Sequence, residues 1–162
     1  MSMTGNEARA IVLSRLAGFP DRLAAAARDV SSADDAAGGP PAGEWTAREN
    51  VAHLVAVERD VWHQRLDHLA VLPAGEEAAW SWTEPGPVEG PEAATLDSAL
   101  ALFAAERAAT LARLAALDEA GWARIGIHSA YGRMDIVGLL GIAADHDDEH
   151  IANMRNGRAG LA

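Results

Sequence analysis

The sequence contains no cysteine and no lysine. Without cysteine, no disulfide can form and no thiolate can bind a metal or act as a nucleophile. Any metal must therefore be held by histidine, carboxylate or water. All 13 basic residues are arginine, and 24 acidic residues outnumber them to give a net charge of −11. A surface with this charge repels phosphate backbones, so we expect no nucleic-acid partner.

The chain also lacks the run of ~18–20 apolar residues that a bilayer-crossing helix requires, so we expect no membrane contact. Its first residues, MSMTGNEARAIVL, do not place a basic region before an apolar segment, as a secretory signal does. We therefore expect a cytoplasmic protein. The 162 residues suit one domain, 1–162, with a sizeable core.

Helix-forming alanine, leucine, arginine and glutamate dominate the composition, and no segment shows a sustained alternation of period two. This pattern predicts an all-α protein. Apolar residues recur at helical spacing in four segments, which predicts a four-helix bundle. The segments span about residues 5–29, 46–69, 94–118 and 136–156.

Local signals predict where these helices are interrupted and where they begin. Pro20 removes an amide donor, so we expect a kink there or a new short helix. Residues 31–43 form a loop by composition. Thr46 and Glu49 have the spacing of a capping box at the start of the second helix. Asp135 is the expected N-cap of the last helix.

The connection 70–93 is rich in glycine and proline and carries Trp80 and Trp82. A loop of this length inside a compact domain is usually functional or disordered, and two tryptophans argue against disorder. These two residues are candidates to line the mouth of a pocket. An alternative is that they close the end of the bundle. The connection 119–134 shows no strong helical pattern.

The stretch HDDEH places His146 and His150 four residues apart on one face of the last helix. Two imidazoles at this spacing can hold a transition metal. Taken alone, such a pair is more often a hydrogen-bonded core pair or lies on the surface. The pair belongs to a row at helical spacing that should face inward. The row comprises Leu139, Ala143, His146, His150 and Asn153.

Bundle metal sites draw ligands from facing helices, so the other histidines are candidates for a third ligand. His53 lies at the edge of the apolar stripe of the second helix. His63 and His68 lie ~15 and ~22 Å further along that helix, too far to share its site. Polar neighbours place both of these histidines on a solvated face. We expect His128 to hydrogen-bond the end of the bundle.

Several charged or polar side chains lie near these positions. We expect Glu58 and Arg107 to be two solvated charges rather than a buried pair. We expect Asp147, which points away from the histidine face, to make a surface or inter-helix contact. Glu149 is a candidate base or a partner for the outer nitrogen of an imidazole. Asn153 is a candidate to line the pocket or to fill the bundle.

Two segments resemble the DinB/YfiT-like family of metal-binding four-helix-bundle proteins. The first, EWTARENVAHLVAVERDVWHQRL, is similar to the family's second-helix motif of tryptophan, Ser/Thr-x-x-Glu and a His-Leu pair. The second, GWARIGIHSAYGRMDIVGLLGIAADHDDEHIANM, resembles its C-terminal half, which ends in His-Asp-x-x-His. Asp135 stands where the family usually has threonine. The first helix and the loop 70–93 carry no specific motif.

The resemblance implies a divalent metal bound by His53, His146 and His150. It further implies an up-down-down-up bundle with long loops after the first and second helices, often assembled as a homodimer. Zinc or nickel would be the expected metal, and manganese and iron also tolerate such ligands.

Relatives in the family include thiol S-transferases and a thiol-dependent isomerase. The resemblance therefore implies a low-molecular-weight thiol attacking a small-molecule electrophile with help from the metal. One alternative is a non-catalytic stress-response protein whose metal is structural. Another is a helical protein without metal.

Overall fold

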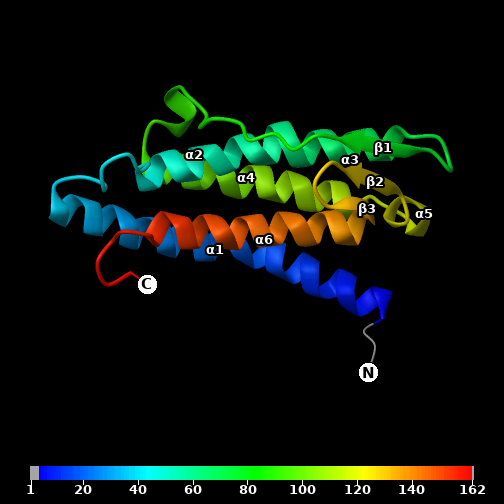
Figure 1. Cartoon of the computed structure of the whole chain (residues 1–162), viewed down its shortest axis with the longest axis horizontal. Coiled ribbons are helices and arrows are strands. Elements are labelled where there is room, and N and C mark those ends of the chain that lie inside the picture. The colour runs from blue at the N-terminus through cyan, green and yellow to red at the C-terminus, as the bar shows by residue number, and fades with distance from the viewer. Residues whose placement is uncertain (1–3, 162) are drawn as a thin grey trace.

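Four long helical segments carry the core of the protein, whose computed structural model describes residues 4–161 (Figure 1). They are α1 (Gly5–Ala37), a continuous run of α2 (Ala47–Val57), the π-helix η1 (Glu58–His63) and α3 (Gln64–Val71), then α4 (Leu96–Ala115) and α6 (Ile136–Arg155). The connections contain β1 (Glu77–Trp80), the short 3-10 helix η2 (Pro91–Ala93), α5 (Glu119–Trp122), β2 (Ile125–His128) and β3 (Gly132–Asp135). The predicted four-helix bundle is confirmed, and among residues 4–161 no helix is long and apolar enough to cross a membrane.

Side-chain pairs between the helices define their directions. Arg15 pairs with Asp145, and Arg22 with Asp148, so α1 and α6 run parallel. The pairs between the second segment and α4 also keep one order: Arg59–Glu106, His63–Thr110 and Asp67–Arg113. Figure 1 shows the two parallel pairs running in opposite directions, so the four segments run up, down, down and up.

The first helix is longer than predicted and passes through Pro20 as one element. It continues beyond residue 29 to Ala37 and stops at Gly38, whose φ of 81° lies in the left-handed region. Proline deprives the Leu16 carbonyl of its helical donor. The guanidinium of Arg107 supplies a donor instead, with Nη1 3.1 Å from that oxygen. No new helix begins at Pro20, and a distant arginine supplies the donor that the proline lacks.

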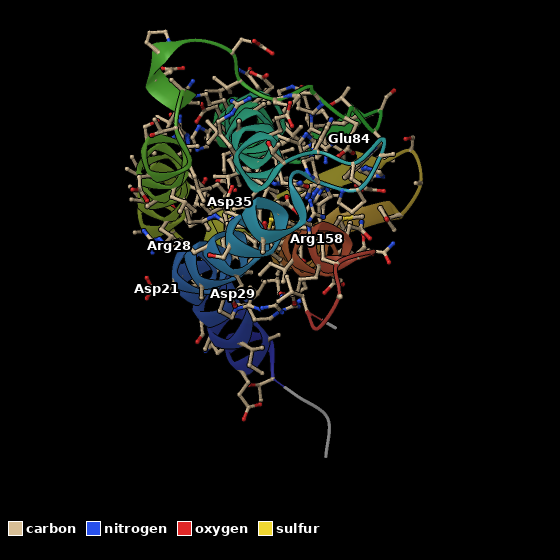
Figure 2. The ribbon with its side chains drawn as sticks, turned by 90° about the vertical axis from the view of Figure 1, so that its left-hand side faces the viewer. Asp21, Arg28, Asp29, Asp35, Glu84 and Arg158 are labelled. Carbon is tan, nitrogen blue, oxygen red and sulfur yellow. The ribbon has the colours of Figure 1, made fainter. Side chains whose placement is uncertain are left out.

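The last turns of α1 are held by an ion pair that the sequence did not reveal. Buried Asp34 accepts hydrogen bonds from Arg158 Nε and Nη2 at 2.7 and 2.9 Å. Arg158 also donates to the carbonyl of Trp45. The acidic residues labelled on the outside of the same helix in Figure 2 are exposed: Asp21, Asp29 and Asp35. Residues 31–37, expected as part of a loop, are therefore anchored as helix.

The predicted caps are confirmed. The Thr46 hydroxyl accepts the amide of Glu49, and the Glu49 carboxylate accepts the amide of Thr46. At the start of α6, Asp135 accepts the amide of Gly138 at 2.9 Å. These caps satisfy amides that have no partner inside the helix, and so they define where the two histidine-bearing helices begin.

The protein is mainly helical, as predicted, and a small three-stranded sheet lies in the connections between the helices. β1 pairs in parallel with β2, and β2 pairs antiparallel with β3. Each strand has four residues, too few for an alternating pattern to be visible in the sequence. Trp80 covers the sheet at Gly126, where an added Cβ would lie 2.2 Å from the indole ring.

A buried charged group lies where the two halves of the apolar core meet. On α1 one half includes Leu16 and the other begins at Phe19. Between them, Arg107 is 1% exposed and ion-pairs with Glu58 and Asp147 at 2.6 and 2.9 Å. The expectation of two solvated charges for Glu58 and Arg107 is therefore wrong. Asp147 makes the inter-helix contact that was one of its two predicted roles, and it is buried.

The π-helix η1 explains why His63 lies in the core although its polar neighbours predicted a solvated face. A π-turn adds one residue to an α-turn, so the face that points to the core shifts after it. His63, expected on a solvated face, is 6% exposed, and its Nε2 lies 2.9 Å from the Thr110 hydroxyl. Arg65 is also buried, at 4%. His68 is exposed as expected, and its Nδ1 accepts the indole N–H of Trp80.

The charged layer can be tested by removing its cation. We expect Arg107→Met to lower the free energy of unfolding by about 3–5 kcal/mol, because it leaves two buried carboxylates unpaired. The matched control is Arg113→Met, which breaks the more exposed pair with Asp67 and should cost less than about 1 kcal/mol. Urea unfolding measures both, and equal losses would contradict this account.

Candidate metal centre

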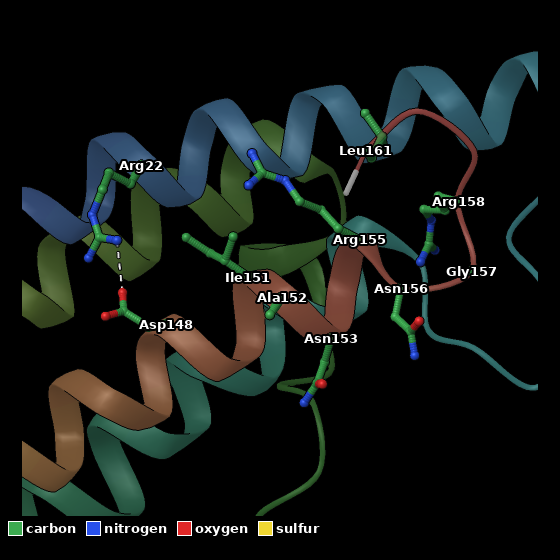
Figure 3. Close-up of a pocket in the computed structure, with 10 residues that line it drawn as sticks. All are labelled: Arg22, Asp148, Ile151, Ala152, Asn153, Arg155, Asn156, Gly157, Arg158 and Leu161. Carbon is green, nitrogen blue, oxygen red and sulfur yellow. Dashed lines mark hydrogen bonds and ion pairs between the residues drawn. The ribbon is translucent and has the colours of Figure 1, made fainter.

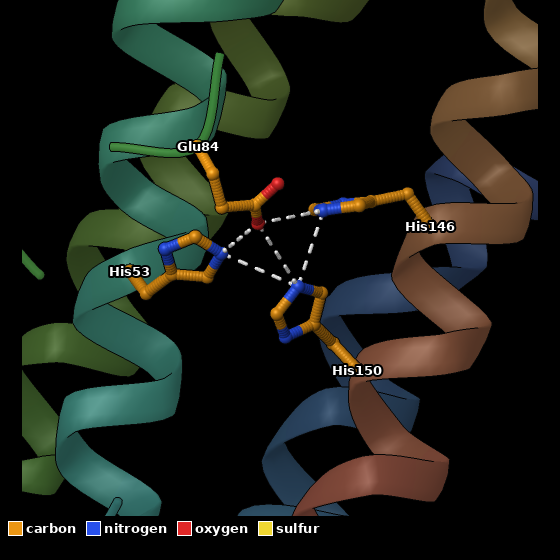
Figure 4. A group of neighbouring side chains, drawn as sticks. All are labelled: His53, Glu84, His146 and His150. Atoms are coloured by element: carbon orange, nitrogen blue, oxygen red, sulfur yellow. Dashed lines mark hydrogen bonds and ion pairs between the residues drawn. The ribbon is translucent and has the colours of Figure 1, made fainter. Parts of the chain in front are cut away.

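The three histidines that the sequence singled out come together between α2 and α6, and a glutamate joins them (Figure 4). His53 lies on α2, His146 and His150 lie one turn apart on α6, and Glu84 lies on the loop between β1 and η2. One ligand-capable atom from each of these four side chains lies within 4.8 Å of the others. The group is therefore close enough to hold a single ion.

The distances between these atoms match a ligand shell. Nε2 of His150 lies 3.2 Å from Nε2 of His53 and 3.1 Å from Nε2 of His146. Oε1 of Glu84 lies 2.9 Å from His53 Nε2 and 3.3 Å from His146 Nε2. Metal–nitrogen bonds of about 2.0–2.1 Å place neighbouring ligand atoms roughly 2.9–3.4 Å apart in octahedral or tetrahedral arrangements.

The tautomer of His53 follows from its surroundings. Its Nδ1 lies 2.7 Å from the carbonyl oxygen of Pro85 and must donate to it. Nε2 of the neutral ring therefore presents a lone pair to the site. The same loop thus holds His53 through Pro85 and supplies Glu84. The Nδ1 atoms of His146 and His150 are buried and have no partner among residues 4–161.

Burial keeps the two imidazoles of α6 in the form that binds metals. Desolvation, reinforced by the neighbouring His146 and His53, lowers the pKa of His150 to about 4. Desolvation also lowers the pKa of His146, although Glu84 opposes the shift. Burial alone would raise the pKa of Glu84, but its hydrogen bond to His146 and the imidazole charges lower it. At neutral pH the two rings of α6 are therefore neutral, and Glu84 is a carboxylate.

Protons alone do not satisfy this arrangement. His150 Nε2 is within 3.2 Å of two other Nε2 atoms, yet a neutral ring can donate to only one of them. The unprotonated Nε2 of His53 also lies 2.9 Å from Oε1 of Glu84, so two acceptors face each other there. A divalent cation would satisfy all four groups, so these residues fit a metal. Nitrogen and oxygen ligands of this kind suit zinc, nickel, manganese or iron and do not select among them.

A pocket of about 220 Å³ reaches His146 from the solvent side. Its other lining residues are Trp82, Tyr131, Ile142, Asp145 and Glu149. Of the two tryptophans predicted to line a pocket mouth, Trp82 is among these lining residues. Trp80 is not, and it packs on the sheet at Gly126. Glu149 is exposed at the pocket and makes no hydrogen bond to an imidazole within the described chain.

Asn153 does not continue the histidine row into the site. It is exposed and lines a larger pocket of about 650 Å³ near the C-terminal end of α6 (Figure 3). Arg22 and Asp148 form an ion pair in that pocket, at 2.8 Å. None of the three histidines lines it. The last turn of α6 has left the inward-facing row, so the predicted roles of Asn153 in lining the metal pocket or filling the bundle are wrong.

The sequence did not predict that Glu84 joins the site, and it predicted a different hydrogen-bond partner for His128. Glu84 sits in an irregular loop, where no periodicity shows which way a side chain points. Its only signal is its place beside Trp82 in a long loop of a kind that is often functional. His128 hydrogen-bonds the amides of its own turn, at Ala130 and Tyr131, rather than a helix end.

Comparisons with known proteins agree with the fold. A family model described as the DinB superfamily matches residues 6–154. Among solved structures, the chain is similar to YfiT from Bacillus subtilis, with 20% identity and a TM-score of 0.66. The match covers 94% of this chain and 86% of that one. YfiT is described as "a probable metal-dependent hydrolase with an unusual four-helix bundle topology". No curated protein matches the sequence significantly.

The depressed pKa of His150 predicts a pH dependence of the metal-free protein. The pKa falls from 6.5 to about 4 on folding, so the unfolded chain holds the proton between these values. The free energy of unfolding should therefore decrease as pH falls through this window, by up to about 3 kcal/mol. Asp147 acts in the opposite direction, because desolvation raises its folded pKa to about 7.

His150→Gln isolates the imidazole while leaving Asp147 in place. Urea unfolding of both proteins in the presence of a chelator, at pH 7, 6 and 5, measures the effect. The stability difference, wild type minus variant, should shrink as pH falls. Parallel stability curves would show that His150 is not held neutral by the fold.

Proposed function

Because the chain belongs to the DinB superfamily, we propose that it is a metal-dependent enzyme in which a small thiol attacks an electrophilic substrate. The observation that carries the proposal is the convergence of three imidazoles and one carboxylate beside a pocket open to small molecules. His53, His146 and His150 would hold the ion. When bound, a divalent metal supplies positive charge that stabilises a thiolate and polarises a carbonyl group.

Glu84 differs from the histidines in a way that bears on catalysis. Its side chain is 45% exposed and comes from a loop, whereas the side chains of His53 and His146 are 1% and 8% exposed from helices. A catalytic site needs a position that a substrate can occupy. Glu84 is the group that can withdraw without disturbing a helix, so it would give that position to the thiol.

The pocket residues would orient the reactants. The rings of Trp82 and Tyr131 provide apolar walls, and the Trp82 ring lies 5.5 Å from that of His146. Glu149 lines the same pocket and would accept the proton that the thiol releases. The chain has no cysteine of its own, so the nucleophilic sulfur must arrive on a cosubstrate.

Two other functions have specific support. Hydrolysis, with water as nucleophile, is favoured by the description of YfiT, whose fold this chain shares. A structural metal is favoured by Glu84 itself, because four protein ligands are typical of closed structural sites. The role of Glu84 therefore distinguishes a catalytic from a structural metal. The identity of the nucleophile distinguishes thiol transfer from hydrolysis.

Metal binding is tested with protein purified without a histidine tag. We expect one metal per chain, and we expect His53→Ala and His150→Ala to weaken binding by more than the 10–100-fold typical of losing an outer partner. His68→Ala removes an exposed histidine outside the site and should bind normally. Elemental analysis and competition with a chromogenic chelator measure these affinities. A chain without metal that shows no thermal shift with zinc or nickel would contradict the proposal.

Glu84→Ala distinguishes an exchangeable ligand from a structural one. If the glutamate gives way to substrate, the variant should keep its metal with an affinity loss of about tenfold and should melt close to wild type. Loss of both metal and thermal stability, as large as in His53→Ala, would instead support a structural metal. Chelator competition and thermal unfolding read out the two cases.

The nucleophile is identified from products. Metal-loaded protein is incubated with a small thiol and an activated electrophile, and mass spectrometry quantifies the thioether. We expect its formation to exceed the uncatalysed rate only when metal and His150 are both present. Ester hydrolysis at the same metal site without any thiol, with no thioether formed, would favour the hydrolytic function.

A further inference from the structure

Arg65 is a buried arginine that has no acidic partner. The three buried arginines among residues 4–161 are Arg65, Arg107 and Arg158, and the other two are paired with carboxylates. Arg65 Nη2 donates to the carbonyl of Ser81 at 3.2 Å, but its buried Nη1 donates to nothing in the described chain. Burying a charge without a counter-charge costs free energy, so we expect an anionic ligand to pair with Arg65.

Three indole rings surround the Arg65 guanidinium. Its Cζ lies 5.2, 5.6 and 6.0 Å from the ring centres of Trp62, Trp80 and Trp82. The faces of these rings attract the positive charge, which explains how the arginine can be buried here. The Nη1 group still has no hydrogen-bond acceptor in the described chain. The indole N–H of Trp62 is itself buried without an acceptor.

His128 adds a third unpaired donor to the same cluster. Its Nδ1 accepts the backbone amides of Ala130 and Tyr131 at 3.0 and 3.3 Å, so the proton of the neutral ring must be on Nε2. That nitrogen is buried and has no acceptor. The ring packs 5.7 Å from Trp82, on the indole that also faces Arg65.

We propose that Arg65, His128 and Trp62 form a binding site for a carboxylate-sized anion. Native proteins rarely leave buried donors unpaired, and here three of them, one permanently charged, belong to one aromatic cluster. A planar carboxylate matches the guanidinium and accepts from neutral N–H groups as well. A neutral ligand would leave the charge of Arg65 uncompensated.

The anion site lies next to the candidate metal centre. Trp82 separates them, with its ring 5.5 Å from His146 and 6.0 Å from the Arg65 Cζ. Trp62 also contacts both, at 6.5 Å from His146 and 5.2 Å from Arg65. The anion is therefore either a free small carboxylate or the carboxylate of the electrophile. The second source rests on the proposed function, whereas the first does not.

Acetate is the probe for the site, and acetamide is its neutral counterpart of the same shape. Both are titrated into full-length protein, with and without metal, while a bulky sulfonate buffer keeps the ionic strength constant. Acetate should raise the melting temperature saturably, by about 3–6 °C at ten times its Kd, and change the tryptophan fluorescence. Acetamide should do neither. A response absent from the metal-free protein, or equal for both compounds, would overturn the proposal.

Arg65→Met removes the charge and keeps the length of the side chain. It should abolish the acetate response and, in acetate-free buffer, melt no lower than wild type, because it removes an uncompensated buried charge. Arg133→Met is the control, since Arg133 is exposed and paired with Glu77. It should keep the full response. If Arg65→Met does not fold, His128→Phe replaces it and should weaken acetate binding about tenfold; an undiminished response in the folded variant would overturn the site.

The two sources are distinguished with a matched pair of electrophiles, chloroacetate and chloroacetamide. If the site receives the substrate, Arg65→Met should raise KM for chloroacetate in the thiol reaction at least tenfold and leave chloroacetamide unchanged. If it holds a free anion, both substrates should change together while acetate binding is still lost. If neither is turned over, the proposed function fails, and the acetate titration still decides the anion site.

Discussion

The packing of the four long helical segments depends on the buried hydrogen bonds and ion pairs of Arg107. From α4 its guanidinium reaches the Leu16 carbonyl of α1, the Glu58 carboxylate of η1 and the Asp147 carboxylate of α6. Phe19 and Phe103 lie against it, with ring centres 5.5 and 5.0 Å from Cζ. Donors and acceptors this deeply buried must be paired in fixed geometry, so the group defines the rotation of each helix about its own axis.

The rotation of α6 about its axis determines which way His146 and His150 point. Asp147 lies between His146 and His150 in sequence and points to Arg107, so the histidines of the same helix are turned toward α2. A shift of α6 by one residue would rotate its side chains by ~100° and separate the imidazoles from His53. The site is completed from outside the bundle, where the loop after β1 holds His53 through Pro85 and contributes Glu84. The helices therefore supply three of the four groups, and a loop supplies Glu84.

The parts predicted from sequence were those encoded by local spacing. The i, i+4 pair of His146 and His150 and the cap at Thr46 each depend on residues within one turn. Family resemblance connected His53 to them, which spacing alone could not do. The missed parts depend on contacts between distant segments. Pro20 was expected to interrupt the first helix, but Arg107 supplies the donor that the proline lacks. His63 was expected on a solvated face, but it lies in the π-helix and is buried. Glu84 and Arg65 acquire their surroundings only when the loop folds over the bundle.

We propose that these converging imidazoles form a metal site that the buried charged layer aligns. X-ray diffraction from metal-loaded crystals, measured on both sides of the absorption edge of the metal, tests it directly. We expect one anomalous peak within bonding distance of Nε2 of His53, His146 and His150, with Glu84 as the additional ligand. A peak elsewhere, or none at this position in the presence of excess zinc or nickel, would contradict it.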